Sequence, residues 1–183
     1  GLCDLKETLG QQLLEDCEGD FFSTNHEELL EREEVDAAII STDENYHVEP
    51  AIKAAEEGHD LFIEKPLATS PTESADVLRT IEKEGVDAVV GYTQRFRRRL
   101  LATKAKVEDG ELGHVNTVVT RAFMNRMVPK ATVRRTEDSK YLTPMVVSGT
   151  HALDISMWLL QKDPISVYAR SVDDALGEQG TKD

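Results

Sequence analysis

Cysteine and long apolar runs are scarce in this chain of 183 residues. Cys3 and Cys17 are the only two cysteines, and no metal-binding spacing surrounds them, which predicts neither a disulfide framework nor a metal site and favours a reducing compartment. No apolar stretch approaches the roughly 20 residues that a membrane-spanning helix needs, and no secretory leader opens the given sequence. We therefore expect a cytoplasmic protein that is not embedded in a membrane.

Positive charge is also in short supply. The chain has 21 Lys and Arg against 35 Asp and Glu, a formal net charge of −14. Such a balance disfavours nucleic acid and anionic membrane surfaces as partners. The hydrophobic fraction of 39% is nevertheless enough for a packed core, which argues against disorder throughout.

The first half of the chain alternates short apolar runs with amphipathic ones. Strands are predicted at 35–40, 60–63 and 86–91, and helices at 25–33, 47–57 and from Ser70 to Gly85. Ser70 to Glu73 reads as a capping box with proline at the first helical position. Strands alternating with helices over short connections predict a doubly wound parallel α/β sheet.

The second half of the chain is less regular. Helices are predicted at 95–109 and 148–160, and strands at 114–123 and 165–172. Between them, 124–144 has no clear period, and connections of this length in a compact domain are usually functional or mobile. This half reads as part of an α+β domain.

Glu64-Lys65-Pro66 follows the strand predicted at 60–63 and is the most informative short motif. Ligands of open α/β sheets bind at the carboxyl ends of the strands. Pro66 disfavours a helical conformation for Lys65 and raises the chance of a cis bond, so the lysine should project from a bend. The alternative is an ordinary solvated lysine at a strand exit.

Thr42, Asn45 and His47 follow the preceding strand in the same way. These residue types also favour turns and helix caps for backbone reasons alone, so a structural role is the competing interpretation. Polar residues after three successive strands, including Arg95 after the third, would gather at one edge of the sheet. That convergence favours a binding site.

The ordered set of motifs resembles the glucose-fructose oxidoreductase, inositol dehydrogenase and MocA family (Gfo/Idh/MocA). The matching segments are Val35-Asp36-Ala37, Ser41-Thr42 with Asn45 and His47, Glu64-Lys65-Pro66-Leu67, Gly91-Tyr92 with Arg95-Phe96, and His151 with Asp154 and Trp158. The resemblance implies an NAD(P)-dependent dehydrogenase acting on a hydroxyl carbon of a sugar, cyclitol or related polyol. It implies an incomplete Rossmann domain over 1–93, and over 94–183 part of a substrate and oligomerisation domain with an open, mostly antiparallel sheet.

The same resemblance implies roles for individual residues. Lys65 and His151 would be catalytic and would contact the substrate hydroxyl, and Tyr141 would join them in substrate binding. Cofactor contacts are implied for Asp4, Thr42, Asn45, His47, Glu64, Lys65 and Arg95. Asp4 at the ribose position favours NAD, with NADP as the alternative. A homo-oligomer formed through the carboxyl-terminal sheet is also implied.

The chain departs from the family pattern in two places. It contains no G-x-G-x-x-G turn for the pyrophosphate, so we expect a sequence truncated at both ends. The family often has an aspartate four residues before the histidine, where this chain has Val147. That change leaves open a non-catalytic, nucleotide-sensing regulator on the same fold. Asp154, three residues after His151, we interpret as a structural partner rather than a replacement.

Overall fold

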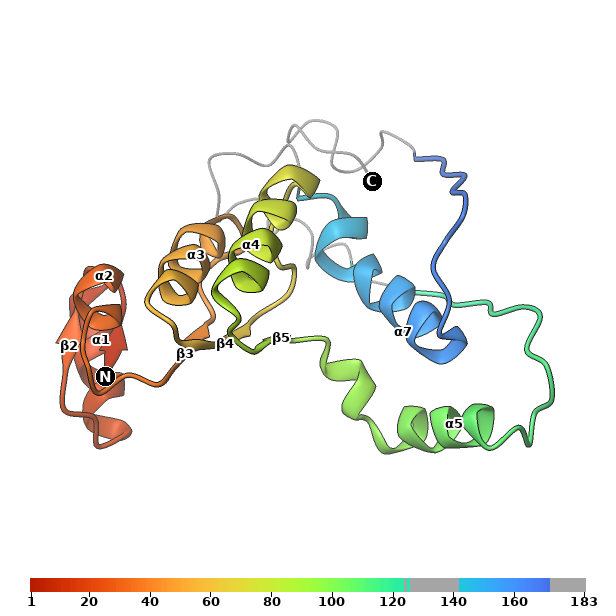
Figure 1. The fold of residues 1–183 in the computed structure, drawn as a ribbon, viewed down its shortest axis with the longest axis horizontal. Coiled ribbons are helices and arrows are strands. Elements are labelled where there is room, and N and C mark those ends of the chain that lie inside the picture. The colour runs from red at the N-terminus through yellow and green to blue at the C-terminus, as the bar shows by residue number, and fades with distance from the viewer. Residues whose placement is uncertain (124, 126–141, 172–183) are drawn as a thin grey trace. The chain divides into compact units, whose positions relative to one another are not determined.

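The computed structural model of the chain describes residues 1–123, 125 and 142–171, and divides into two compact units, Gly1–Gly91 and Tyr92–Asp183. In the first unit, β3 (Ala37–Ile40), β4 (Asp60–Ile63) and β5 (Ala88–Val90) form a parallel sheet in the order β3-β4-β5. The connections carry α3 (Val48–Glu56) and α4 (Pro71–Glu84), which lie side by side (Figure 1). The predicted parallel α/β arrangement is confirmed, and its sheet is open.

The core of this unit lies between the sheet and its two helices. Ile40, Leu61 and Ile63 of the strands pack with Val77 of α4 and with three alanines of α3. Because those alanines, Ala51, Ala54 and Ala55, have small side chains, α3 can approach the sheet closely. This layer fixes the strands whose ends are considered below.

The boundaries of α4 agree with the sequence signals. The Ser70 side chain accepts a hydrogen bond from the Glu73 amide, and Pro71 is the first helical residue. Gly85 ends the helix at φ 72°, a left-handed conformation that favours glycine. The helix predicted from Ser70 to Gly85 is confirmed.

The other face of the sheet carries apolar side chains that remain exposed. Ile39, Phe62 and Val89 are neighbours in the strand register and lie on the face opposite Ile40 and Ile63. Parallel sheets are usually covered on both faces, and their strands are therefore apolar throughout. The strands of this sheet are continuously apolar because both faces of a parallel sheet are usually buried.

A second parallel pair lies at the beginning of the first unit. It consists of β1 (Leu2–Cys3) and β2 (Phe22–Ser23), with α1 (Glu7–Asp16) between them and α2 (His26–Leu30) after them. The sequence had not indicated β2. A Cβ on Gly10 of α1 would lie 2.8 Å or less from two atoms of the Phe22 ring, so a larger residue here requires the ring to move. Leu9 and Leu13 of α1 are exposed.

The second unit contains mainly helices in its described part. They are the 3-10 turn η2 (Thr93–Phe96), α5 (Arg98–Glu108), the π-helical turn η3 (Met145–Gly149) and α7 (Thr150–Leu160). The strands predicted at 114–123 and 165–172 are wrong for the described residues, which have no strand there. Isolated extended segments have no ladder to satisfy their backbone groups, and Val119 and Val167 are accordingly exposed.

Candidate functional site

The carboxyl ends of the three central strands lie level with one another. Ile40 pairs with Ile63, the last residue of β4, which in turn pairs with the last residue of β5. The Glu64 amide donates to the Ile40 carbonyl at 2.8 Å, and the Gly91 amide donates to the Ile63 carbonyl at 2.7 Å. The residues that follow β3 and β4 therefore begin at one edge of the sheet, where open α/β sheets bind ligands.

Lys65 occupies the bend directly beyond β4 and is half-buried. Its amide donates to the Glu64 carboxylate at 3.1 Å, and the Lys65–Pro66 peptide bond is cis. Gly91 packs against Glu64: a Cβ on this glycine would lie 3.2 Å from Glu64 Oε2 and 3.5 Å from its Cα. The predicted bend is confirmed, and the close approach of β5 explains the glycine.

His47 lies at the start of α3 and is 1% exposed. Its Nδ1 is 2.7 Å from the Pro66 carbonyl oxygen, and its Nε2 is 3.1 Å from the Thr42 carbonyl oxygen. The ring thus connects the turn after β3 with the bend after β4. Both ring nitrogens contact backbone carbonyl oxygens, and the cofactor contact predicted for His47 stays a prediction.

The other polar residues predicted at the edge also make local contacts. The Thr42 hydroxyl donates to the Tyr46 carbonyl at 3.0 Å, and Asn45 lies half-buried in the 3-10 turn η1 (Glu44–Tyr46). After β1, the Asp4 carboxylate accepts from the Lys6 amide at 2.7 Å. Short polar side chains commonly cap turns in this way. Cofactor contacts by Asp4, Thr42 and Asn45 remain predictions.

The second unit places one side of α7 against η2 and α5. Thr150, Asp154 and Trp158 are four residues apart and so lie on one face of the helix. The Tyr92 and Thr150 hydroxyls are 3.0 Å apart, and the Lys104 ammonium donates to the Trp158 carbonyl at 2.8 Å. This face contacts η2 and α5 through polar groups along its length.

Arg95 and Asp154 form the central contact of this face. Arg95 Nε lies 3.1 and 3.0 Å from the two Asp154 carboxylate oxygens, and Nη2 also donates to Oδ1. The hydrogen bond to Asp154 raises the pKa of the Arg95 guanidinium, which therefore stays charged. The structural role predicted for Asp154 is confirmed. Arg95 contacts Asp154 through Nε and Nη2, and the cofactor contact predicted for Arg95 stays a prediction.

His151 is the second residue of α7 and is half-buried. Its ring meets Tyr92 edge to face, with ring centroids 6.0 Å apart. Val147, four residues earlier in η3, is 7% exposed, and its apolar side chain supplies no group for proton transfer. Tyr141 lies outside the described residues. No role was predicted for Tyr92, although its place between Gly91 and Arg95 in the motif is a signal that could have singled it out.

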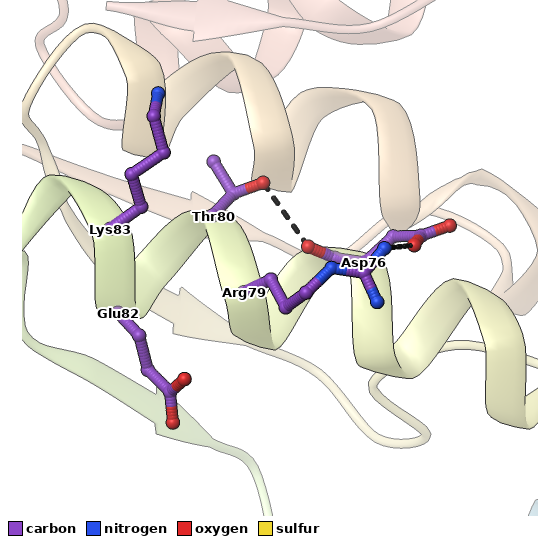
Figure 2. A pocket seen from close by; sticks show the side chains of 5 residues that line it. All are labelled: Asp76, Arg79, Thr80, Glu82 and Lys83. Carbon is purple, nitrogen blue, oxygen red and sulfur yellow. Dashed lines mark hydrogen bonds and ion pairs between the residues drawn. The ribbon is translucent and has the colours of Figure 1, made fainter.

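A surface hollow elsewhere in the first unit is unrelated to the strand ends. Its lining residues, shown in Figure 2, all come from α4: Asp76, Arg79, Thr80, Glu82 and Lys83. Arg79 pairs with Asp76, and the Thr80 hydroxyl donates to the Asp76 carbonyl. These are contacts within one helix, so the hollow presents exposed helix surface and none of the predicted site residues.

The described residues contain neither a membrane-spanning helix nor a metal-binding group. Within this part of the chain, no helix is both long and apolar enough to cross a membrane. The same residues contain no cluster of three or more His, Cys, Asp or Glu side chains that could hold a metal ion. The hydroxyl, amide and carboxylate groups at the carboxyl edge can form hydrogen bonds with the hydroxyl groups of a ligand.

Comparison with known families decides the relationship of the chain. Residues 1–92 match the GFO/IDH/MocA model, described as an oxidoreductase family with an NAD-binding Rossmann fold. Residues 100–183 match the GFO/IDH/MocA C-terminal domain. The chain belongs to this family. The GFO/IDH/MocA resemblance drawn from the sequence is thereby confirmed, and its first part is an NAD-binding type of domain.

Several relatives have named activities. The 2,7-anhydro-N-acetylneuraminate hydratase of Mediterraneibacter gnavus is 36% identical over 106 residues, which cover 58% of this chain and 28% of the relative. The scyllo-inositol 2-dehydrogenase (NAD(+)) of Bacillus subtilis is 38% identical over 86 residues, which cover 47% of this chain and 25% of the relative. The chain thus spans only part of the relatives that it matches.

A solved structure shows the same fold. The myo-inositol 2-dehydrogenase of Lactobacillus plantarum aligns with a TM-score of 0.83 at 18% identity, covering 98% of this chain and 54% of that one. At this identity the similarity establishes the fold and not the substrate.

Proposed function

We propose that the protein is an NAD(P)-dependent oxidoreductase that acts on a hydroxyl carbon of a sugar, cyclitol or related polyol. One observation carries the proposal: in a GFO/IDH/MocA chain, Lys65 lies directly beyond β4 at the level carboxyl edge of the parallel sheet. Two relatives named for inositol dehydrogenase activity favour polyols as the substrate class.

The residues at this edge fit a dinucleotide, because its ribose hydroxyls need acceptors and donors such as Thr42, Asn45 and Glu64, and Asp4 follows β1 of the other parallel pair. When bound, a nicotinamide dinucleotide accepts or donates the hydride. Lys65 hydrogen-bonds the reacting hydroxyl and holds its proton, and His151 binds a substrate hydroxyl or relays that proton. These two roles rest on the family resemblance. Asp4 favours NAD over NADP, because its carboxylate repels a 2′-phosphate.

We also propose that the two parts of the chain have different functions. Residues 1–93 belong to the cofactor-binding domain, and 94–183 to the domain that binds substrate and forms a homo-oligomer. Light scattering on the whole protein tests the oligomer, and a variant lacking the second part should lose the assembly while retaining affinity for NAD.

Turnover by Lys65 variants of the whole protein tests the reaction. NADH absorbance with a panel of polyols and sugars identifies a substrate, and Lys65→Ala should then lower kcat by about 10²-fold or more. Affinity for NAD should change little. Lys83→Ala is the control, because Lys83 is an exposed lysine of α4 that pairs only locally with Glu84 among its described contacts. Unchanged turnover in Lys65→Ala would refute the catalytic assignment.

Two alternatives predict other outcomes. The relative named as a hydratase favours a reaction on a sugar in which NADH does not accumulate, which product analysis by mass spectrometry would reveal. Val147 favours a nucleotide-sensing regulator, since its buried apolar side chain provides no proton relay. A regulator would bind NAD without converting any member of the panel.

A further inference from the structure

We propose that His47 is a positioning residue that fixes the bend carrying Lys65. This inference rests on the proposed function for its effect on turnover, but its structural part concerns the bend alone. His47 is buried and belongs to a different element from Lys65. Its ring therefore links the start of α3 to the bend, so the position of α3 constrains the position of Lys65.

The ring contacts the chain on both sides of the edge. Nδ1 lies 2.7 Å from the carbonyl oxygen of Pro66, the residue after Lys65, and Nε2 lies 3.1 Å from that of Thr42. Both partners are carbonyl oxygens, so a ring nitrogen that carries a hydrogen donates to the oxygen it faces, and the contact with Pro66 is the shorter of the two. Pro66 has no amide hydrogen, so its carbonyl is the only backbone group through which hydrogen bonding can hold it.

His47 is itself firmly anchored. It precedes α3, whose residues Ala51, Ala54 and Ala55 are completely buried against the sheet. On the other side of Lys65, the Glu64 amide continues the β4 ladder by donating to the Ile40 carbonyl. The residues before and after Lys65, Glu64 and Pro66, are therefore both tied to rigid elements. The contact between His47 and Pro66 supplies the second of these attachments.

His59 provides a matched control within the same unit. It is 6% exposed, directly precedes β4, and its Nε2 lies 2.6 Å from the Leu30 carbonyl oxygen. β4 thus has a buried histidine bonded to a backbone carbonyl at each end. His59 lies at the amino end, away from Lys65. Substitutions of the two residues remove the same kind of contact but only one adjoins the proposed site.

The test compares His47→Leu, His47→Asn and His59→Leu in the whole protein. We expect His47→Leu and His59→Leu to lower the melting temperature by similar amounts. His47→Leu alone should lower kcat by about tenfold to a hundredfold, since misplacement of a reacting group by about 1 Å has that effect. His47→Asn should recover much of the loss, because the Asn amide can occupy the position of Nδ1. Affinity for NADH should stay within about threefold in all three.

Hydrogen exchange of the backbone segment 64–68 gives a readout independent of turnover. It should become faster in His47→Leu, remain near the original rate in His47→Asn, and not change in His59→Leu. Equal kcat and equal exchange in the His47 and His59 variants would overturn the proposal. If the original protein converts no substrate but exchange changes as expected, the positioning of the bend stands and the proposed function fails.

Discussion

The ion pair between Arg95 and Asp154 predicts an unequal response to loss of either partner. The Asp154 side chain is 7% exposed, whereas that of Arg95 is 41% exposed. Asp154→Asn leaves Arg95 accessible to water and retains one acceptor, so it should cost about 1 to 2 kcal/mol. Arg95→Met leaves a buried carboxylate without its main partner and should cost about 3 to 5 kcal/mol.

The double variant sharpens this comparison. Arg95→Met with Asp154→Leu removes both charges, and should be more stable than Arg95→Met alone because no uncompensated carboxylate remains. Thr103→Ala on α5 is a suitable control, since its hydroxyl bonds only the Arg99 carbonyl of the same helix among its described contacts. That control should change stability by less than about 1 kcal/mol.

Fluorescence-detected urea unfolding measures these effects in the second unit. Trp158 is the single tryptophan of the chain, and the Arg95 guanidinium lies 6.0 Å from its ring centroid. Its emission therefore reports on the helix face that contains the ion pair. Asp154→Asn costing as much as Arg95→Met, or additive effects in the double variant, would refute the reasoning.

Three further predictions concern other parts of the chain. Burial, reinforced by nearby carboxylates, raises the pKa of the Cys3 thiol, so iodoacetamide should label Cys3 more slowly than exposed Cys17 in the folded protein; equal rates before and after unfolding would contradict this. Because the pKa of the Cys3 thiol is higher in the folded than in the unfolded protein, its contribution to the free energy of unfolding is present below the unfolded pKa. That contribution is lost as pH rises through the folded pKa. Gly91→Ala places a Cβ 3.2 Å from the Glu64 carboxylate that the Lys65 amide contacts, and should lower kcat/KM about threefold to tenfold in steady-state assays; unchanged kinetics would show that Glu64 moves without consequence. Raising NaCl from about 0.05 M to about 0.5 M should increase the melting temperature by a few degrees, because screening weakens repulsion within a chain of net charge −14. A lower melting temperature in salt would mean that surface ion pairs outweigh this repulsion.

Much of the first unit could be predicted from local sequence signals. The boundaries of α4 depend on Ser70, Pro71 and Gly85, which act within one helical turn of themselves. The strands β3, β4 and β5 were found because apolar runs of this length between turn residues are typical of parallel sheets. The two-residue strand β2 was missed because Phe22–Ser23 is too short to show a period.

The second unit was less predictable for a physical reason. Extended segments become strands only when another strand satisfies their backbone groups, and an apolar run such as the one around Val118 carries no information about such a partner. Met157 of α7 is apolar and exposed, because apolar character alone does not say which side of a helix packs. The π-helical turn before α7 likewise has no local signal in the sequence.

The sequence by itself determined the parallel α/β class, the family and the position of Lys65 at a strand end. These follow from residue order, apolar periodicity and the Glu64-Lys65-Pro66 motif. Only the tertiary structure decided that His47 bonds across the bend and that Arg95 is occupied by Asp154, which is 59 positions away. A sequence identifies the residues that can form a hydrogen bond, but long-range packing selects which partner comes within reach.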